Sequence, residues 1–345
     1  MLASLDSAFA NHESITGLDL SGGMWRGVMA VDLGRSANEL ILLNGDVDMR
    51  AVQLTAFGNP VDGLEYVDIP EPDAPGPNQV LIGVEFSPIN PNDLMLAQGI
   101  YAFRPPLPTV IGNEGVGRIL AVGPGVESVK VGDRVLAPLS SFTWRERMVI
   151  SAGGLSSLPS DADPQQLAML AINPPTAALL LSEYVDLKPG EWVVQNAANS
   201  GVGRWVIAFA KTRGLKTVNI VRRPELVAEL EAIGGDLVVV DSPDVSARIK
   251  AAVGQAEIRL ALDGVSGPAT GVLAATLSPR GTLVSFAAMS GGPMSISPLD
   301  VIFKPITVRG FWMGHPEFAA KLAPAVVQAA KMIASGRLHI PVAGT

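Results

Sequence analysis

The stretch Asn-Ala-Ala-Asn-Ser-Gly-Val-Gly at residues 196–203 constrains the fold of this chain more than any other feature. It follows an apolar run at 192–194 and leads into a helical pattern of apolar residues at 206–210. A turn of small residues between a strand and a helix can cradle a dinucleotide pyrophosphate, because the backbone approaches the phosphates closely and the helix N-terminus offers free N–H groups. Only Gly203 is a glycine in the register of the dinucleotide fingerprint, so the octet alone is equally compatible with an ordinary tight turn.

Two arginines follow the next predicted strand, at 217–221. The dinucleotide motif normally has an acidic residue near this point, which binds the ribose 2′-hydroxyl. Arg222 and Arg223 can instead pair with a 2′-phosphate, which a carboxylate would repel. NADP(H) is therefore favoured over NAD(H); the alternative is that two arginines merely solvate the end of a strand.

The bulk composition is that of a globular α/β enzyme. With 345 residues, 48% of them hydrophobic, the chain is long enough for two domain cores. Its net charge of -8 argues against binding to nucleic acid or to an anionic membrane. No apolar run is long enough to span a bilayer, and no Lys or Arg precedes Arg26, so we expect neither a secretory signal nor a transit peptide and assign the cytoplasm. The absence of cysteine excludes disulfides and thiolate metal ligands.

The pattern of predicted elements changes along the chain. Residues 49–170 alternate short apolar strands with Pro, Gly and Asp turns, which predicts a largely antiparallel β domain. Residues 171–312 alternate strand and helix patterns, which predicts a doubly wound parallel sheet. We expect residues 1–48 to be an N-terminal extension, either loosely ordered or upstream of a natural start at Met49. Residues 313–345 are expected to form a C-terminal helix that returns toward the first domain.

A β domain followed by a dinucleotide domain, with Val-Gly-Asp-Arg-Val at 131–135 between them, resembles the medium-chain dehydrogenase/reductase superfamily. The resemblance implies an α/β architecture of a GroES-like antiparallel β catalytic domain and a Rossmann domain. Zinc members of that superfamily bind the metal with a Cys three residues before an Asp, and with the His of a Gly-His-Glu triplet. Asn90 and Asn113 occupy those positions here, and the chain has three His and no Cys, so we expect no metal site.

Seven blocks, in order along the chain, sharpen the resemblance to the 2-enoyl thioester reductases, the mitochondrial-type enzymes of fatty-acid synthesis and their bacterial relatives. They are Ile-Asn-Pro-Asn-Asp-Leu at 89–94, Gln-Gly-Ile-Tyr at 98–101, Gly-Asn-Glu-Gly at 112–115, Thr-Trp-Arg at 143–145, Ile-Asn-Pro-Pro-Thr-Ala at 172–177, the octet, and Ile-Phe-Lys at 302–304 with Arg-Gly-Phe-Trp at 309–312. The resemblance implies NADPH-dependent reduction of the α,β double bond of 2-enoyl thioesters carried by coenzyme A or acyl carrier protein. Quinone reductases share some of these blocks, so an NADPH quinone or enone reductase is one alternative. A non-catalytic NADPH-binding protein or an impaired paralogue is another.

By this resemblance Tyr101 takes the place of the family's catalytic tyrosine. The chemistry requires such a group, because negative charge grows on the thioester oxygen and the α-carbon then needs a proton. The alternative for Tyr101 is a loop aromatic that covers an apolar edge.

The resemblance also implies a set of cofactor-binding residues. They are Asn173 near the nicotinamide; Asn199, Ser200, Gly201 and Val202 at the pyrophosphate; Arg222 and Arg223 at the 2′-phosphate; Phe286, Ala287, Ala288 and Met289 beside the dinucleotide; and Phe311, Trp312 and Met313 along the nicotinamide face. Taken singly, Asn173 could cap a helix, and Phe311 with Trp312 could belong to a core or a dimer seam.

Two departures from the family pattern alter these expectations. Pro224 stands where the family usually has a second arginine, so Arg223 must substitute for it and the preference for NADPH is expected to be weaker. The family continues through another helix and a final strand with a cofactor-contacting lysine, whereas this chain stops at Thr345. We therefore expect segment 313–345 to be truncated and the enzyme to be incomplete or impaired. Because relatives dimerise through their nucleotide domains, the resemblance also implies a homodimer.

Overall fold

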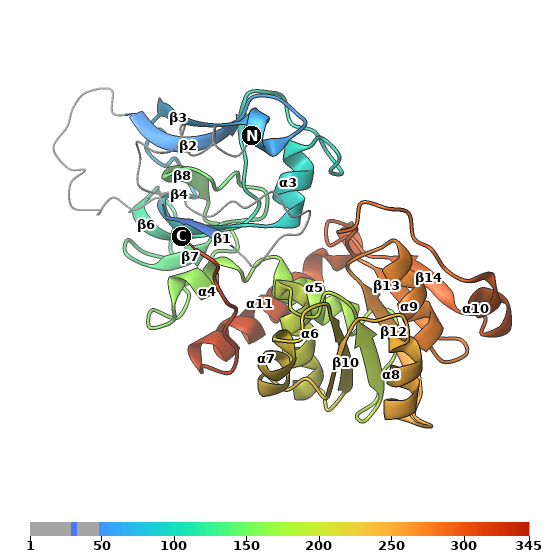
Figure 1. Cartoon of the computed structure of the whole chain (residues 1–345). Coiled ribbons are helices and arrows are strands. Elements are labelled where there is room, and N and C mark those ends of the chain that lie inside the picture. Colours follow the sequence, from blue (N-terminus) through green and yellow to red (C-terminus); the bar gives the residue numbers. More distant parts are fainter. Residues whose placement is uncertain (1–28, 33–47, 345) are drawn as a thin grey trace. The chain divides into compact units, whose positions relative to one another are not determined.

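The computed structural model describes residues 29–32 and 48–344, and these fall into two compact units (Figure 1). The first unit ends at Ala171 and resumes at Gln328, and the second runs from Ile172 to Val327. The domain limits expected from the sequence, after residues 48, 170 and 312, stay a prediction. Most of the expected N-terminal extension, residues 1–28 and 33–47, lies outside the described residues.

The second unit is built on a six-stranded sheet in the order β11-β10-β9-β12-β13-β14, in which every neighbouring pair is parallel. From β9 the chain runs outward to β11, crosses to β12 and then runs outward to β14, so the strand order reverses between β9 and β12. This arrangement confirms the doubly wound sheet predicted from the sequence. The strands are β9 (Trp192–Gln195), β10 (Lys216–Val221), β11 (Leu237–Val240), β12 (Ile258–Asp263), β13 (Thr282–Ser285) and β14 (Thr307–Gly310).

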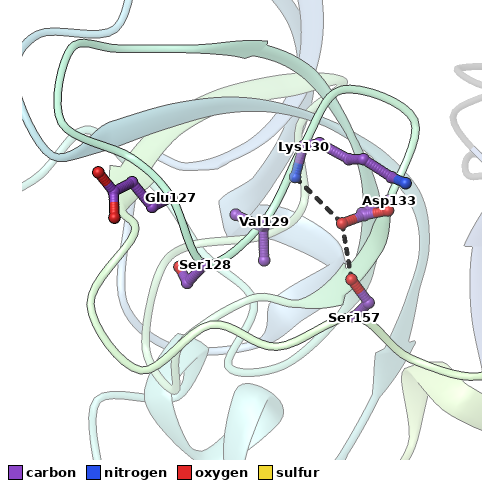
Figure 2. A pocket seen from close by; sticks show the side chains of 6 residues that line it. All are labelled: Glu127, Ser128, Val129, Lys130, Asp133 and Ser157. Atoms are coloured by element: carbon purple, nitrogen blue, oxygen red, sulfur yellow. Dashed lines mark hydrogen bonds between the residues drawn. The ribbon is translucent and has the colours of Figure 1, made fainter.

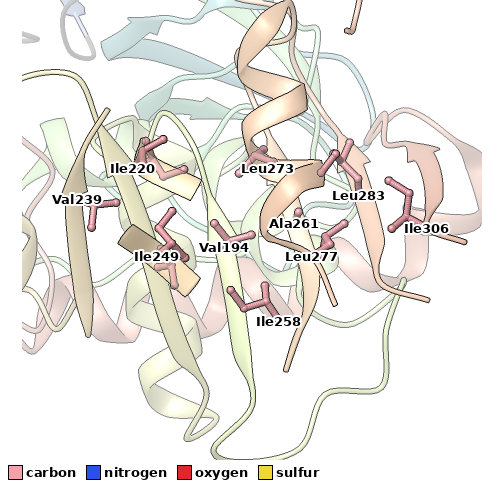
Figure 3. Packing of buried hydrophobic residues seen from close by; sticks show 13 residues of the cluster. Val194, Ile220, Val239, Ile249, Ile258, Ala261, Leu273, Leu277, Leu283 and Ile306 are labelled. Atoms are coloured by element: carbon pink, nitrogen blue, oxygen red, sulfur yellow. The ribbon is translucent and has the colours of Figure 1, made fainter. Parts of the chain in front are cut away.

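Apolar residues on both faces of this sheet are covered by helices. One buried cluster packs strand residues such as Ile220 against Ile249 of α8 and Leu273 of α9 (Figure 3). A second cluster joins Val221, the next residue along β10, to helices α6 and α7. Adjacent strand residues thus serve opposite faces, which is why these strands read as unbroken apolar runs. The helices that lie wholly in this unit are α5 (Asn173–Leu180), α6 (Gly201–Thr212), α7 (Leu226–Ala232), α8 (Val245–Val253), α9 (Pro268–Thr276), α10 (Pro298–Phe303) and the 3₁₀ turn η2 (Pro316–Phe318).

The first unit consists of two antiparallel sheets, which confirms the predicted antiparallel β domain. In one sheet the order is β1-β4-β6-β7 with β8 also paired to β4, and in the other it is β3-β2-β5. Strand β1 comes from the expected N-terminal extension and pairs with the end of β4. The elements are β1 (Met29–Asp32), β2 (Asp48–Leu54), α2 (Pro60–Gly63), β3 (Leu64–Pro70), β4 (Gln79–Ile89), α3 (Pro91–Ala97), β5 (Thr109–Val110), β6 (Val116–Val122), β7 (Arg134–Leu136), β8 (Arg147–Ser151) and α4 (Pro164–Ala168).

Helix α11 (Ala319–Ala334) contains the boundary at which the chain re-enters the first unit. The residues after it attach to α4, because Gln166 donates to the carbonyl of Ile340 at 2.8 Å and accepts from its N–H at 2.7 Å. Within residues 29–32 and 48–344, no helix is long and apolar enough to cross a membrane.

Candidate active site

The residues predicted to bind a dinucleotide meet at one edge of the parallel sheet. The octet directly follows β9, Arg222 follows β10, Phe286 follows β13 and Phe311 follows β14. Because parallel strands end at the same edge, these four segments share the carboxyl side of the sheet, and the octet lies at the reversal of strand order between β9 and β12. Ligands of open α/β sheets bind in that position.

The octet forms a tight turn that opens α6. Ser200 is the N-cap of the helix, and its hydroxyl accepts the N–H of Gly203 at 3.1 Å. Ala197 takes a φ of 48°, so the turn uses the left-handed region without a glycine there. At Gly203 a glycine is required, because an added Cβ would lie 2.5 Å from the carbonyl oxygen of Ala198. Of the three glycine positions in the dinucleotide fingerprint, the one occupied by glycine here is therefore the position at which helix and strand pack together.

We expect Gly203→Ala to lower the unfolding temperature and to weaken NADP(H) binding. The new methyl group would collide with the backbone of Ala198, and backbone cannot move aside as a flexible side chain can. Calorimetry and a fluorescence titration with NADPH measure the two effects. Gly153→Ala is the matched control, because a Cβ there meets only the Ser151 hydroxyl at 3.4 Å. Equal behaviour of the two variants would contradict the steric role of Gly203.

Helix α5 brings a second predicted residue to the octet. Asn173 is the first residue of α5 and is buried, and a Cβ on Gly201 would lie 2.8 Å from its Nδ2 atom. The amide of Asn173 therefore contacts the first turn of α6. One turn further along α5, the hydroxyl of Thr176 lies 3.9 Å from the sulfur of Met313. Three of the predicted segments are thus in contact around the N-terminal ends of α5 and α6.

Of the remaining predicted residues, Phe286 and Phe311 pack against neighbours, whereas Trp312 and residues 287–289 are partly or fully exposed. The ring of Phe286 covers Gly264, where a Cβ would lie 2.9 Å from its Cζ atom. Phe311 is buried and packs on Tyr184 and Phe318, with ring centroids 6.5 and 5.2 Å away. Trp312 is 40% exposed and is the more exposed residue of this pair. After Phe286, the side chains of Ala287, Ala288 and Met289 are partly or fully exposed.

The two arginines after β10 differ in their surroundings. Arg223 lies 3.6 Å from the carboxylate of Glu225, and both side chains are exposed. Arg222 forms no ion pair within the described part of the chain. Partial burial and the neighbouring charge of Arg223 lower the pKa of Arg222, while Asp241 at the end of β11 opposes the shift. Arg222 is therefore the guanidinium with more capacity to bind an added anion.

Two supporting side chains at this edge were not predicted from the sequence. Asp263, the buried last residue of β12, accepts from Asn196 Nδ2 at 2.7 Å and from the Thr270 hydroxyl at 2.6 Å. Asn196 in turn accepts a hydrogen bond from the N–H of Gly264 at 2.8 Å. This bond links the first residue of the octet to the loop after β12. Arg204 of α6 donates to the carbonyl of Asn199 at 3.1 Å and pairs with Glu229 at 2.7 Å.

Tyr101 lies in the first unit, in the loop after α3. Gly99 turns the chain there with a φ of 72°, and its carbonyl accepts from Arg104 Nε at 2.5 Å. The ring of Tyr101 is half-buried against the apolar cluster that contains Trp144, and it meets Phe103 edge-on with centroids 5.6 Å apart. Packing therefore fixes the position of the ring.

The positions of the zinc ligands in metal-dependent relatives hold a network of amides and carboxylates. Asp93 is fully buried and accepts from Asn90 N at 2.7 Å, Asn113 N at 2.9 Å and Asn113 Nδ2 at 2.7 Å. Asn90 Nδ2 donates to Glu114 Oε1 at 2.8 Å. Both asparagine amides are thus engaged with carboxylates. No group of three or more His, Cys, Asp or Glu among the described residues could hold a metal ion.

Burial raises the pKa of Asp93 to about 7, although three N–H groups donate to it. The ordinary value is 3.8, so between about pH 4 and pH 7 the folded protein binds a proton that the unfolded chain has lost. We therefore expect the free energy of unfolding to fall as the pH rises through this window, by up to about 1.4 kcal/mol per pH unit for this group, and to level off above it. Urea unfolding between pH 4.5 and 8 measures this, and Asp93→Asn should remove this part of the slope. An unchanged slope in the variant would show that another group titrates.

A separate, open hollow lies on the first unit (Figure 2). In it Asp133 accepts from Lys130 N at 3.0 Å and from the Ser157 hydroxyl at 2.6 Å. None of the predicted site residues lines it, and we assign it no part in the activity. The lining residues are Glu127, Ser128, Val129, Lys130, Asp133 and Ser157.

Two families match successive parts of the chain. Residues 76–154 match the alcohol dehydrogenase GroES-like domain, and residues 201–329 match the family described as zinc-binding dehydrogenase. Among named relatives, the mitochondrial enoyl-[acyl-carrier-protein] reductase of Caenorhabditis elegans is 38% identical over 271 residues, which cover 77% of this chain and 78% of the relative.

Solved structures resemble the chain over most of its length. The mitochondrial 2-enoyl thioester reductase Etr1p/Etr2p heterodimer from Candida tropicalis is 29% identical with a TM-score of 0.78, over 86% of this chain and 91% of that one. A complex of Etr1p with NADP and crotonyl-CoA is 28% identical with a TM-score of 0.78, over 85% and 90% of the two chains. A quinone oxidoreductase from Pseudomonas syringae is 30% identical with a TM-score of 0.72, over 84% and 90%.

Proposed function

The chain belongs to the medium-chain dehydrogenase/reductase family, in the branch of the enoyl-[acyl-carrier-protein] reductases, and on this premise we propose that it reduces the α,β double bond of 2-enoyl thioesters with NADPH. The thioester would be carried by coenzyme A or acyl carrier protein, in fatty-acid metabolism. The observation that carries the proposal is that four segments expected to bind NADPH follow strand ends at a single edge of the parallel sheet. The named relatives give this edge its interpretation.

The residues at this edge fit NADPH. The N-terminal turn of α6, with Ser200 and Gly201, offers N–H groups and partial positive charge to a pyrophosphate. Arg222 offers a guanidinium to a 2′-phosphate. The side chain of Asn173, in contact with that turn, would bind near the nicotinamide. The cofactor, when bound, supplies the hydride.

Tyr101 would act on the thioester itself. As the double bond is reduced, negative charge develops on the thioester oxygen of the substrate, and a hydroxyl that donates a hydrogen bond there lowers the barrier. The α-carbon must also receive a proton, which Tyr101 gives directly or through a water that it holds. The packing of its ring against Phe103 limits the number of positions that the hydroxyl can take.

Consumption of NADPH with crotonyl-CoA, compared with a simple quinone, tests the proposal. We expect turnover of the thioester and little or none of the quinone. The resemblance to a quinone oxidoreductase makes the reverse result the main alternative. Binding of NADPH without turnover of either acceptor would identify a non-catalytic protein.

A homodimer through the second unit is part of the proposal. Helix α10 exposes Ile302 and Phe303 by 65% and 74%, and all four residues of the edge strand β14 are exposed. Among the described residues β14 ends the sheet, and an exposed apolar helix together with such an edge strand is suited to pairing with a second copy of the chain. Light scattering should report a dimer for the wild type and a monomer for Phe303→Asp. A wild-type monomer would refute this part.

Zinc independence and the cytoplasmic location are also proposals. The side-chain amides of Asn90 and Asn113 donate to carboxylates at the two positions where zinc members have metal ligands. We therefore expect the activity to survive dialysis against a chelator. The named relatives are mitochondrial, so fractionation of the source cells decides between that compartment and the cytoplasm.

A further inference from the structure

Asp263 is a fully buried carboxylate at the carboxyl end of β12, and all four groups that donate to it belong to the second unit. Its Oδ1 atom accepts from Asn196 Nδ2 at 2.7 Å and from the N–H groups of Val265 and Ser266, both at 2.9 Å. Its Oδ2 atom accepts from the Thr270 hydroxyl at 2.6 Å. One carboxylate thus joins the start of the octet, the loop after β12 and the first turn of α9.

The link to the octet is made by backbone and side chain together. The amide of Asn196 donates to Asp263 and accepts from Gly264 N at 2.8 Å, so both of its ends are engaged and its orientation is fixed. Asn196 N also donates to Leu262 O at 3.3 Å. A displacement of Asp263 would therefore be transmitted to the start of the turn that opens α6.

The loop after β12 has a backbone conformation that needs support. Ser266 takes a φ of 69°, in the left-handed region that residues with a Cβ rarely adopt. Such a conformation persists only where the surrounding structure imposes it. Asp263 does so here, because its Oδ1 atom accepts the N–H of Ser266 and of the residue before it.

The same loop supports segment 286–290, which includes the residues predicted to lie beside the dinucleotide. Three backbone hydrogen bonds join the segment to the loop after β12. The carboxylate that shapes this loop therefore supports two of the predicted cofactor-binding segments, the octet and the segment after β13. The three bonds run from Phe286 N to Asp263 O at 3.0 Å, from Met289 N to Gly264 O at 3.3 Å and from Ser290 N to Val265 O at 2.8 Å.

We propose that Asp263 is a positioning residue of the dinucleotide site, whose Oδ1 atom holds the octet and segment 286–290 in the arrangement that binds the cofactor. The inference rests on the proposed function. The position requires an acceptor, because three N–H groups converge on Oδ1 and a donor there would repel them. The octet would bind the pyrophosphate, which NADPH and NADH share, so Asp263 should matter equally for both cofactors.

Asp263→Ala removes both acceptor atoms. We expect the Kd for NADPH and the Kd for NADH each to rise by about 10-fold or more, the equivalent of losing a hydrogen bond to a charged group. Asp263→Asn can keep an acceptor at Oδ1 and turn its amide toward the Thr270 hydroxyl, which also accepts, so its Kd values should stay closer to those of the wild type. Fluorescence titrations with the two cofactors measure these constants.

Asn196→Ala tests whether Asp263 acts through the octet. It removes the link between the two residues, so the double variant Asn196→Ala/Asp263→Ala should bind NADPH less weakly than the sum of the two single losses predicts. Additive losses would overturn the proposal. A loss confined to NADPH in Asp263→Ala would do the same, because it would indicate an effect at the 2′-phosphate.

Thr270→Val and Thr276→Val are a matched pair on α9. Both threonines are buried, and each hydroxyl donates one hydrogen bond, from Thr270 to Asp263 at 2.6 Å and from Thr276 to Leu273 O at 2.7 Å. Both variants should have a lower unfolding temperature. Only Thr270→Val, which releases Oδ2 of Asp263, should raise the two Kd values, by about 3-fold. Equal Kd values in the two variants would contradict the positioning role.

Turnover of crotonyl-CoA by the wild type tests the proposed function separately, because the titrations need no reaction. If the wild type bound neither cofactor, hydrogen exchange would still decide the role of Asp263. The amides of residues 197–203 and 286–290 should exchange faster in Asp263→Ala than in Thr276→Val. Equal exchange in both variants would refute the inference.

Discussion

Tyr101→Phe is expected to lower kcat/KM for crotonyl-CoA by about 10²–10³-fold, the usual effect of removing one donor from an oxyanion site. The substitution removes only the hydroxyl. The edge-on contact with Phe103 and the packing against the cluster of Trp144 are made by the ring, which phenylalanine retains. The fall should therefore appear mainly in kcat, because the interaction is made chiefly in the transition state.

The oxidation of NADPH followed at saturating cofactor measures this effect, and a fluorescence titration should give an unchanged Kd for NADPH. Phe103→Leu is the control, since it alters the packing partner of Tyr101 and leaves the hydroxyl in place. Full activity in Tyr101→Phe would exclude the hydroxyl as the donor. An equal loss in Phe103→Leu would assign the effect to loop packing instead.

The architecture could be predicted from the sequence because local patterns decide it. The strands of the second unit bury residues on both faces, so they read as apolar runs, and the octet marks the junction of β9 and α6. Several elements of that unit, α8 and β14 among them, were not predicted. Helix α8 buries only Val245 and Ile249, and β14 exposes all four of its residues, so neither carries a strong periodic signal.

The supporting network of the candidate site could not be predicted in the same way. Asp263 meets Asn196 across 67 residues, and Glu114 meets Ala171 across 57. Such pairs depend on tertiary placement, and no spacing rule relates them. One signal was available: Asp263 is a carboxylate at the end of an apolar strand, where the carboxyl edge of a parallel sheet collects polar residues.

Arg222→Glu should raise the Kd for NADPH by about 10- to 100-fold, the equivalent of losing a charge-assisted hydrogen bond. The Kd for NADH should change little, because NADH lacks the 2′-phosphate. The new carboxylate would also repel that phosphate, together with Asp241 nearby. Parallel fluorescence titrations with the two cofactors at low and high salt measure the effect, which should shrink with salt because the site is exposed.

Arg223→Ala is the comparison that separates the two arginines. Arg223 is already close to Glu225, at 3.6 Å, so part of its charge is compensated within the chain, and its removal should weaken NADPH binding less than the change at Arg222. The reverse order would mean that Arg223, next to the proline that replaces the family's second arginine, has taken over the 2′-phosphate. Equal losses for NADPH and NADH in Arg222→Glu would instead indicate a general disturbance of the turn after β10, and the preference for NADPH would need another source.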